Sequence, residues 1–366
     1  MTHVFYRYPA RFSPSFARAA IEAFTSPGEL VLDPFMGGGT TLVEARVLGR
    51  LAIGADISHL AHFISQVKVS PLLPAEVRSL RRWIGNTGPA LNVQTPASPI
   101  EGPAPANLDT RETWRIRKLI SLAIECVDDL GSARSRAFAR CLILKTAQWA
   151  LDGRRRIPTV PEFRAELQVN LDLMLRGMDE FRVAVMEADR SYSGHPPGRA
   201  WCIVAAAADL HQHRIWRHMP KPKLILTSPP YAGVHVVYDR WQITGRRETS
   251  APFWIANSVD GQCTSHYTFG DRRNEAKYFS RAHDAFAGLA RLAAPDTLLV
   301  QLVGFARPER QLPTFLEVLE SAGFEEVDIG PSNRLWRQVP NRKWHADQKG
   351  ETASSKEVVL IHRLLR

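Results

Sequence analysis

The sequence predicts an α/β fold: a mostly parallel sheet of seven strands with an antiparallel last strand, interrupted by a helical insertion. Three observations predict this fold. A strand, a glycine-rich turn, a helix and a second strand ending in an acid follow one another over residues 30–56. The alternation of strands and helices stops at residue 71 and resumes at residue 201. The last two strands are joined without a helix, which favours antiparallel pairing.

The first part of the sheet is expected within residues 1–70. Apolar periodicity and turn residues predict helices at 15–25, 40–48 and 58–67, and strands at 30–33 and 51–56. Ser26-Pro27-Gly28 ends the first helix and Gly49 stops the second. These elements form the first βαβ unit of a doubly wound sheet.

The second part of the sheet is expected within residues 201–366. The predicted strands lie at 201–210, 223–227, 297–303, 324–329 and 357–362, and the predicted helices at 275–292 and 309–322. Two long loops are expected, at 232–274 and at the basic segment 331–350.

The insertion covers residues 71–200. Helical periodicity predicts helices at 111–130, 132–151 and 161–188. The segment 86–107 is rich in proline, alanine and glycine, and we expect it to be a loop.

Composition narrows the class of partner. The net charge is +10, from 47 Lys and Arg against 37 Asp and Glu, which suits a polyanion such as nucleic acid. The four cysteines form no CxxC pair, so neither a disulfide framework nor a metal site is indicated. No apolar stretch reaches membrane-spanning length. We therefore expect a soluble cytoplasmic protein, associated with the nucleoid in a prokaryote.

The glycine turn is the first motif that carries chemistry. It reads Asp33-Pro34-Phe35-Met36-Gly37-Gly38-Gly39-Thr40-Thr41. Glycines after a parallel strand let the backbone turn sharply and approach a ligand closely. No Lys-Ser/Thr pair follows, as a phosphate loop would require, and the spacing differs from the Gly-x-Gly-x-x-Gly of dinucleotide folds. A purely structural turn is the alternative.

Two acids follow later strands. Asp56 ends the second strand and could accept hydrogen bonds from the hydroxyls of a ribose; the alternative is a helix N-cap, for which Ser58 competes. Asp209 ends the third predicted strand and could receive an adenine amino group, although an N-cap is again an alternative.

The second motif is Ser228-Pro229-Pro230-Tyr231, directly after the apolar run 223–227. Two prolines cannot continue a strand, since they lack amide donors and fix φ. The strand end therefore presents carbonyls, a hydroxyl and an aromatic ring. Such groups can accept hydrogen bonds from an amino group and stack on a flat ring.

With these motifs together, the chain resembles S-adenosylmethionine-dependent amino-methyltransferases of DNA, which act on cytosine N4 or adenine N6. The resemblance covers residues 3–67 and 201–366 and includes Tyr8-Pro-Ala-Arg-Phe12-Ser13-Pro14, a segment that closes over the cofactor in the family. It implies a Rossmann-like class I methyltransferase fold. It also implies cofactor contacts at Phe12, Ser13, Asp33, Pro34, Phe35, Gly37, Gly39, Thr40, Thr41, Asp56 and Asp209.

The catalytic residues implied are Ser228, Pro229, Pro230 and Tyr231. An exocyclic amine is a poor nucleophile because its lone pair is delocalised into the ring. Acceptance of its two N–H groups by the Ser228 hydroxyl and the Pro229 carbonyl would localise that lone pair. Tyr231 would stack on the extruded base. Serine at the first position favours cytosine, because adenine enzymes of the family usually place Asp or Asn there.

Contacts to double-stranded DNA are expected near the catalytic strand and in the basic tail. The candidates are His235, Tyr238, Arg240, Arg246, Arg247, Arg337, Arg342 and Lys343. The insertion 71–200 could recognise the target together with the loop 232–274.

The resulting hypothesis is a site-specific DNA methyltransferase that modifies cytosine N4, with or without a cognate restriction or defence partner. Adenine-N6 methylation of DNA and guanine-N2 methylation of RNA are alternatives within the same chemistry. A non-catalytic DNA-binding relative and a nicotinamide-dependent dehydrogenase are alternatives of other classes.

Overall fold

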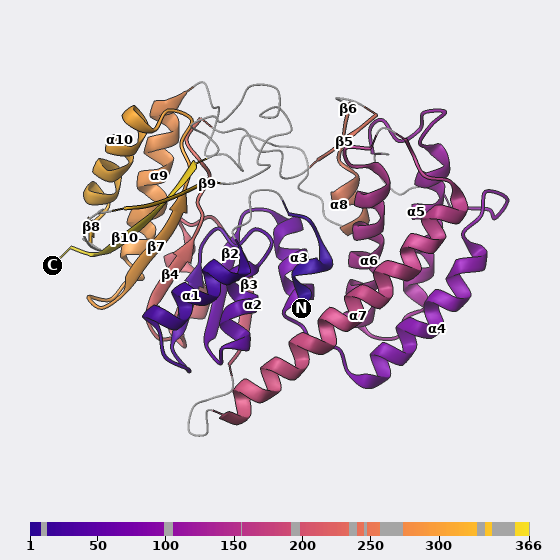
Figure 1. Ribbon diagram of the computed structural model, residues 1–366, viewed down its shortest axis with the longest axis horizontal. Coiled ribbons are helices and arrows are strands. Elements are labelled where there is room, and N and C mark those ends of the chain that lie inside the picture. Colours follow the sequence, from indigo (N-terminus) through magenta and orange to yellow (C-terminus); the bar gives the residue numbers. More distant parts are fainter. Residues whose placement is uncertain are drawn as a thin grey trace. The chain divides into compact units, whose positions relative to one another are not determined.

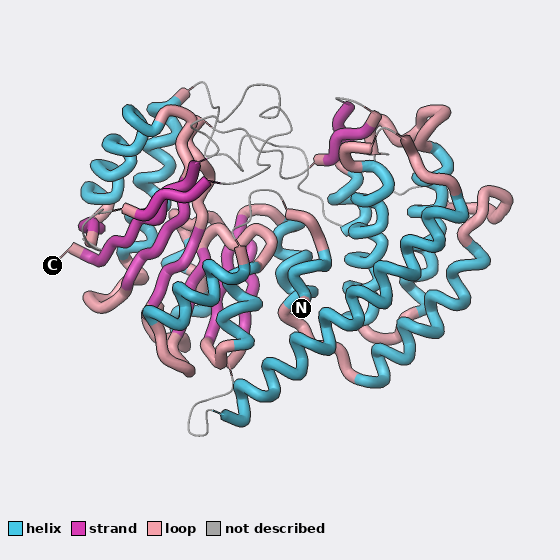
Figure 2. Tube along the Cα trace, viewed as in Figure 1, coloured by secondary structure: helices cyan, strands magenta, loops and turns pink. Residues whose placement is uncertain are grey.

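The computed structural model describes residues 1–8, 13–98, 105–154, 156–191, 198–233, 240–244, 247–256, 274–327, 334–338 and 356–365. The chain divides into two compact units. The helical unit comprises residues 1–7, 63–184 and 237–262, and the sheet unit comprises residues 8–62, 185–236 and 263–366. Figure 2 shows that the strands of the large sheet gather in one unit, whereas helices dominate the other.

The sheet unit contains a sheet of eight strands in the order β3-β2-β1-β4-β7-β10-β8, with β9 paired to β10. Its strands are β1 (Leu30–Asp33), β2 (Leu51–Asp56), β3 (Ala200–Val204), β4 (Leu224–Thr227), β7 (Leu298–Val303), β8 (Phe324–Glu326), β9 (Leu335–Gln338) and β10 (Lys356–Leu364).

The strand directions confirm the predicted fold class. Strands β3, β2, β1, β4 and β7 pair in parallel. The last strand, β10, pairs antiparallel with β7, β8 and β9. This is the doubly wound, Rossmann-like arrangement, in which the carboxyl ends of the parallel strands share one edge of the sheet.

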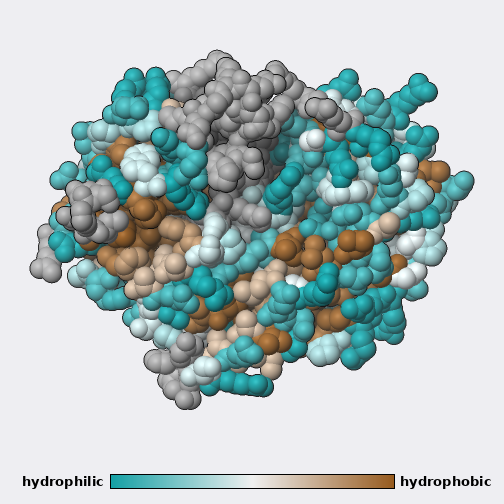
Figure 3. All heavy atoms as spheres, in the orientation of Figure 1, coloured by the Kyte–Doolittle hydropathy of each residue, from teal (hydrophilic) through white to brown (hydrophobic). Residues whose placement is uncertain are grey.

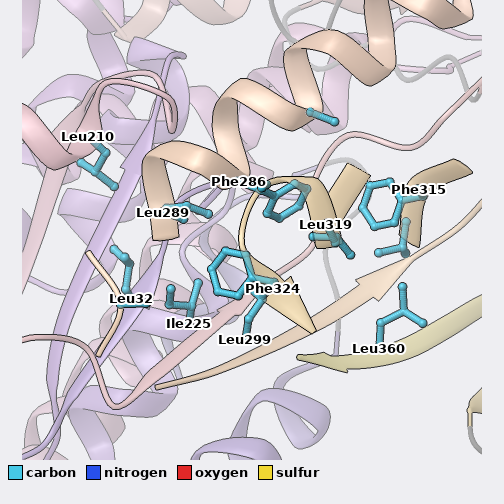
Figure 4. Close-up of a cluster of buried hydrophobic side chains, with 14 of the residues drawn as sticks. Leu32, Leu210, Ile225, Phe286, Leu289, Leu299, Phe315, Leu319, Phe324 and Leu360 are labelled. Atoms are coloured by element: carbon cyan, nitrogen blue, oxygen red, sulfur yellow. The ribbon is translucent and has the colours of Figure 1, made fainter. Parts of the chain in front are cut away.

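Helices cover both faces of this sheet (Figure 1). They are α1 (Pro14–Phe24), α2 (Thr40–Val47), α9 (Glu275–Ala290) and α10 (Pro308–Ser321), with the short 3₁₀ turns η3 (Leu210–Gln212) and η4 (Arg214–Arg217) after β3. Figure 4 shows the core beneath α9 and α10, where Phe286, Leu289, Phe315 and Leu319 meet side chains of the strands. The rings of Phe286 and Phe315 pack edge to face, with centroids 5.7 Å apart.

The helical unit is built from α4 (Pro74–Ala90), α5 (Trp114–Glu125), α6 (Ala133–Leu151), α8 (Ala251–Ala256), the 3₁₀ turns η1 (Thr2–Phe5) and η2 (Cys126–Asp129), and the hairpin of β5 (Trp241–Ile243) and β6 (Arg247–Thr249). The helices α3 (His59–Lys68) and α7 (Val160–Ser191) each have residues in both units. The Trp241 indole donates to the Tyr6 hydroxyl over 3.0 Å, which ties the first residues of the chain to this hairpin.

Four sequence-based expectations were wrong in detail. Helix α4 occupies residues that were given no helix and runs into the expected loop 86–107. Its start is stabilised because the Glu76 carboxylate accepts from the Leu73 backbone N–H over 2.8 Å. Strand β3 ends at Val204, since the small residues after it form turns rather than continue to residue 210.

The two loops also contain regular structure. The expected loop 232–274 holds β5, β6 and α8, and the expected loop 331–350 holds β9. Strand β9 forms because β10 supplies its hydrogen-bond partners, an effect that local sequence does not reveal.

Hydrophilic side chains cover much of the face shown in Figure 3, with apolar patches between them. Within the described ranges, no helix combines the length and apolarity needed to cross a bilayer.

Candidate active site

The glycine turn, the first strand-end acid and the Ser-Pro-Pro-Tyr motif meet at one edge of the sheet. Strand β1 pairs in parallel with both β2 and β4. Asp33 ends β1, Asp56 ends β2, and Ser228 directly follows β4. The topology therefore brings together motifs that are almost 200 residues apart in the sequence.

Asp33 joins the glycine turn to strand β4. Its carboxylate accepts from the Thr41 hydroxyl of α2 over 2.6 Å and from the Thr227 hydroxyl of β4 over 2.7 Å. The backbone N–H of Phe35 donates to it over 3.2 Å. Burial raises the pKa of the carboxyl from 3.8 to about 6, against the opposing effect of these hydrogen bonds. Asp33 is 2% exposed, so its described contacts align the site from within the protein.

The turn after β1 adopts the conformations that its glycines permit. Gly37 has φ of 42° and Gly39 has φ of 72°, both in the left-handed region. The Gly37 N–H donates to the Asp56 carboxylate over 3.0 Å, and the Met36 N–H donates to the Ala55 carbonyl over 3.0 Å. A side chain at Gly37 would meet the Tyr8 ring at 3.0 Å. The turn is thus held against the end of β2.

Asp56 is partly exposed and serves as an acceptor at the strand end. Besides the Gly37 N–H, it receives the Ser58 N–H over 2.9 Å. The N-cap role belongs to Ser58, whose hydroxyl accepts from the Ala61 N–H over 3.3 Å. Asp56 therefore accepts from the turn after β1 and from the residue before α3, at the strand end where the ribose is expected.

Asp209 follows β3 at the start of η3 and is exposed. Its side chain makes no capping hydrogen bond to that turn. The N–H of Ala205, earlier in the same connection, donates to the Asp56 carbonyl over 3.0 Å. The loop that carries Asp209 therefore begins beside the end of β2.

The remaining residues implied for the cofactor divide between the turn and α1. Thr40 and Thr41 begin α2 and are buried, and Pro34 and Phe35 lie within the turn itself. The Ser13 hydroxyl caps α1 by accepting from the Phe16 N–H over 3.3 Å. Phe12 lies outside the described residues.

The Ser228-Pro-Pro-Tyr231 motif is held by hydrogen bonds at three of its atoms. The Tyr278 hydroxyl of α9 donates to the Pro230 carbonyl over 2.7 Å. The oxygens of the Ser228 and Tyr231 hydroxyls are 2.9 Å apart. Among the described residues, none donates a hydrogen bond to the Pro229 carbonyl; Ser228 is partly exposed, whereas Pro229 is buried. The role of the Ser228 hydroxyl and the Pro229 carbonyl as acceptors for an amino group stays a prediction.

Tyr231 is 7% exposed, and its hydroxyl donates to the Glu357 carboxylate of β10 over 2.7 Å. Glu357, itself 4% exposed, forms an ion pair with Arg337 of β9 at 2.6 Å. The stacking role of Tyr231 stays a prediction.

Sequence reasoning missed Glu357, Tyr278 and Thr227. Glu357 opens an apolar run that reads as an ordinary strand, and it lies 126 residues from Tyr231 in the sequence. No local pattern signals such a contact. Thr227 could have been suspected from its place beside Ser228, at the end of a buried strand.

The candidate DNA contacts divide into described and undescribed residues. His235, Tyr238, Arg246, Arg342 and Lys343 lie outside the described residues. Arg240 contacts Glu248 at 3.3 Å, Arg247 is exposed on β6, and Arg337 pairs with Glu357 while lying 5.7 Å from the Phe16 ring centroid.

Several arginines of the helical unit also form ion pairs within it: Arg81 with Asp172, Arg117 with Asp109, and Arg156 with Glu162. The predicted role of the insertion in target recognition therefore depends on the net positive charge of the chain and on arginines other than these.

Residues 2–66 match the N6_N4_Mtase family, which is described as DNA methylase. Among curated proteins, a type II methyltransferase M.MvaI from Kocuria varians is 35% identical over 80 residues, which are 21% of this chain and 18% of that protein. A type II methyltransferase M.BsoBI from Geobacillus stearothermophilus is 40% identical over 67 residues, 18% of this chain and 13% of that protein. The aligned part thus spans less than a fifth of these relatives.

A relative with an RNA-directed name also matches. The tRNA (guanine(10)-N2)-dimethyltransferase of Methanocaldococcus jannaschii is 26% identical over 136 residues, 34% of this chain and 37% of that protein. Among solved structures, a TehB-like SAM-dependent methyltransferase from Corynebacterium glutamicum covers 95% of this chain and 86% of its own, at 10% identity and a TM-score of 0.34. The fold is assigned from the strand order.

The family match implies S-adenosylmethionine as the cofactor. The residues at the strand ends fit this molecule: a glycine turn, a partly exposed carboxylate at Asp56, and an exposed carboxylate at Asp209. Among the described residues, no group of His, Cys, Asp and Glu is placed to hold a metal ion.

Proposed function

We propose that this chain, whose residues 2–66 match the DNA methylase family, transfers a methyl group to the exocyclic N4 amine of a cytosine flipped out of DNA. The observation that carries the proposal is the place of Ser228 and Pro229 directly after β4, one residue beyond Thr227, whose hydroxyl donates to Asp33 of the glycine turn. Two acceptors at this position suit an amino group, and the neighbouring glycine turn suits the cofactor.

Residues at the ends of different strands would bind different parts of the cofactor. The Gly37–Gly39 turn would lie against the methionine end of S-adenosylmethionine, Asp56 would accept from its ribose hydroxyls, and Asp209 would receive its adenine amino group. When bound, the cofactor supplies a methyl group on a positively charged sulfur.

At the target, Ser228 and Pro229 would accept the two N–H groups of the amine, which orients its lone pair and raises its nucleophilicity. Extrusion of the base costs a few kcal/mol, which contacts in the pocket must offset. Neither a covalent nucleophile nor a metal is needed for this displacement. The helical insertion and the segment 232–274 would share recognition of the DNA site.

The first residue of the motif supports cytosine over adenine. Adenine enzymes of the family usually carry Asp or Asn at this position, where this chain has Ser228. A hydroxyl gives one short acceptor next to the Pro229 carbonyl. Adenine-N6 methylation remains the nearest alternative.

A second candidate has an observation in its favour. The match to a tRNA guanine-N2 dimethyltransferase covers more of this chain than the matches to the type II DNA enzymes do. Guanine N2 is also an exocyclic amine, so the same two acceptors would serve it. DNA is favoured because the family match is to DNA methylases.

Mass spectrometry of digested nucleosides tests the choice. DNA and tRNA would be taken from a host that expresses the wild type, Ser228→Ala, or Ser321→Ala as a matched control at the end of α10. We expect N4-methylcytosine in DNA with the wild type and the control, and a loss of at least tenfold with Ser228→Ala. N6-methyladenine or tRNA N2-methylguanine would select an alternative, and 5-methylcytosine or no modified base would contradict the proposal.

Cofactor binding is tested separately by calorimetry. Asp56→Ala should weaken binding of S-adenosylmethionine about tenfold or more, because it removes the acceptor for both the ribose and the Gly37 N–H. The Ser228→Ala variant should bind the cofactor like the wild type. Unchanged binding by Asp56→Ala would remove this residue from the cofactor site.

A further inference from the structure

A chain of hydrogen bonds connects Ser228 to a buried carboxylate on another strand. The Ser228 and Tyr231 oxygens are 2.9 Å apart, and the Tyr231 hydroxyl lies 2.7 Å from Oε1 of Glu357. Tyr231 is 7% exposed and Glu357 is 4% exposed. Water therefore has little access to the two inner members of the chain.

The hydrogen bonds from Ser228 through Tyr231 to Glu357 all donate in one direction. An ionised carboxylate only accepts hydrogen bonds, so the single hydrogen of the Tyr231 hydroxyl points to Glu357. The Tyr231 oxygen can then only accept from Ser228, whose own single hydrogen must point to Tyr231. The lone pairs of the Ser228 oxygen are left to face the target.

Arg337 holds the far end of this chain. Its Nε and Nη2 lie 2.7 Å and 2.6 Å from Oε2 of Glu357, whereas Tyr231 contacts the other oxygen, Oε1. Glu357 and Arg337 are directly opposite each other in the β9–β10 pair. The pairing of β9 with β10 therefore places Arg337 next to Glu357. The ion pair in turn orients the Glu357 carboxylate that accepts from Tyr231.

We propose that Glu357 is a positioning residue that acts through Tyr231 to make Ser228 an obligate hydrogen-bond acceptor toward the target amine. This inference rests on the proposed function and deepens it. An acceptor at Ser228 selects an amino group, as in cytosine, and disfavours a carbonyl at the same position, as in uracil or thymine. Without Glu357 the serine hydrogen can turn toward the target, and the discrimination is lost.

Two substitutions disrupt this series of hydrogen bonds in different ways. Tyr231→Phe keeps the ring but removes the hydroxyl, so the Ser228 hydrogen has no partner there. Glu357→Gln places an amide that can donate to the Tyr231 oxygen, which lets the whole chain reverse. Both variants should lower kcat for methyl transfer to DNA about tenfold or more, with cofactor affinity within twofold of the wild type.

The matched control lies in the same sheet. Glu325 of β8 forms an ion pair with Arg363 at 2.6 Å, and the two residues are directly opposite each other in the β8–β10 pair. Glu325→Gln therefore breaks a cross-strand pair of the same kind without touching the motif, and it should leave kcat within twofold. The double variant Tyr231→Phe/Glu357→Gln should be no slower than the slower single variant, because both act on one chain.

A readout independent of activity is the carbon signal of Tyr231 in protein labelled with ¹³C at tyrosine Cζ, assigned by its absence in Tyr231→Phe. It should shift in Ser228→Ala and in Glu357→Gln, since each changes the hydrogen bonds of the hydroxyl, and it should stay in place in Glu325→Gln. An unmoved signal in Glu357→Gln would contradict the hydrogen bond between Tyr231 and Glu357, and with it the proposal.

The kinetic outcomes separate this inference from the proposed function. A wild type that methylates DNA, together with Glu357→Gln and Tyr231→Phe variants within twofold of its kcat, would overturn the positioning role alone. Multiplicative losses in the double variant would do the same. A wild type that methylates no nucleic acid would overturn the proposed function, and with it any role of Glu357 toward an amine.

Discussion

Two buried carboxylates organise the two sides of the candidate site, and they are held in opposite ways. On the proposed cofactor side, Asp33 is 2% exposed and receives two threonine hydroxyls and one backbone N–H. On the proposed target side, Glu357 is 4% exposed and receives a tyrosine hydroxyl and a guanidinium. The first is held by neutral donors and the second by an opposite charge.

This difference shows that burial alone does not determine what a carboxylate does. Burial raises the pKa of Asp33 to about 6, and its neutral donors only partly oppose that rise. The Arg337 guanidinium gives Glu357 a partner that matches the ionised form, and the direction of the Tyr231 hydrogen bond depends on that form. In the proposed roles, Asp33 depends on its hydrogen-bond geometry, whereas Glu357 depends on its negative charge.

Matched acid-to-amide substitutions give the largest expected effect. Glu357→Gln should lower the free energy of unfolding at pH 7 by about 2 kcal/mol, because it leaves the Arg337 guanidinium without its carboxylate. Asp33→Asn should change it by less than about 1 kcal/mol, since the amide is neutral and can still accept from Thr227. Denaturant unfolding of the two variants measures both values. Equal losses, or a larger loss for Asp33→Asn, would contradict the comparison.

Two glycine-to-alanine substitutions test whether the cofactor side depends on backbone conformation. Gly37→Ala should destabilise by about 1–2 kcal/mol, because φ is 42° and the added Cβ would lie 3.0 Å from the Tyr8 ring. Gly85→Ala in α4 should instead stabilise by about 0.5–1 kcal/mol, since a Cβ there meets nothing within 4 Å. Thermal unfolding gives the sign of each change, and a loss of the same size at both positions would refute the explanation.

The finest test is the dependence of stability on pH. The raised pKa of Asp33 adds stability that is complete below about pH 4 and is lost as the pH rises through about 6. His362, 1% exposed on β10, has a pKa lowered by burial to about 4, so its contribution is complete above pH 6.5 and is lost as the pH falls through 4. The two slopes oppose each other between pH 4 and 6.

Asp33→Asn removes one slope and exposes the other. The stability of this variant should rise with pH between 4 and 6 more steeply than that of the wild type. His362→Gln should show the reverse, a stability that falls relative to the wild type over the same range. Urea unfolding at several pH values measures both, and parallel curves for all three proteins would rule out this assignment.

Local sequence sufficed for the parts of the fold that rest on local rules. The βαβ unit of residues 30–56 was predicted from apolar runs, glycine and the terminal acid, and the structure confirms it. The antiparallel last strand was predicted from the missing helix before it, and β10 confirms this. Helix α4 was missed because its N-cap residue, Leu73, is non-polar and its start at Pro74 is capped by the Glu76 side chain instead. Strand β9 was missed because it depends on its pairing with β10.

The sequence by itself determined the motifs and their order: a glycine turn after Asp33, an acid at Asp56, and two prolines that end β4 beside Ser228. Only the tertiary structure decided which hydrogen-bond partners these groups have. Glu357 and Tyr231 are 126 residues apart, and Asp33 and Thr227 are 194 residues apart, yet each pair is within hydrogen-bonding distance. The reason is physical, because strand propensity and turn chemistry act between neighbours in the sequence. The direction of the buried Ser228–Tyr231 hydrogen bond depends instead on the Glu357 carboxylate, which only the pairing of the strands places there.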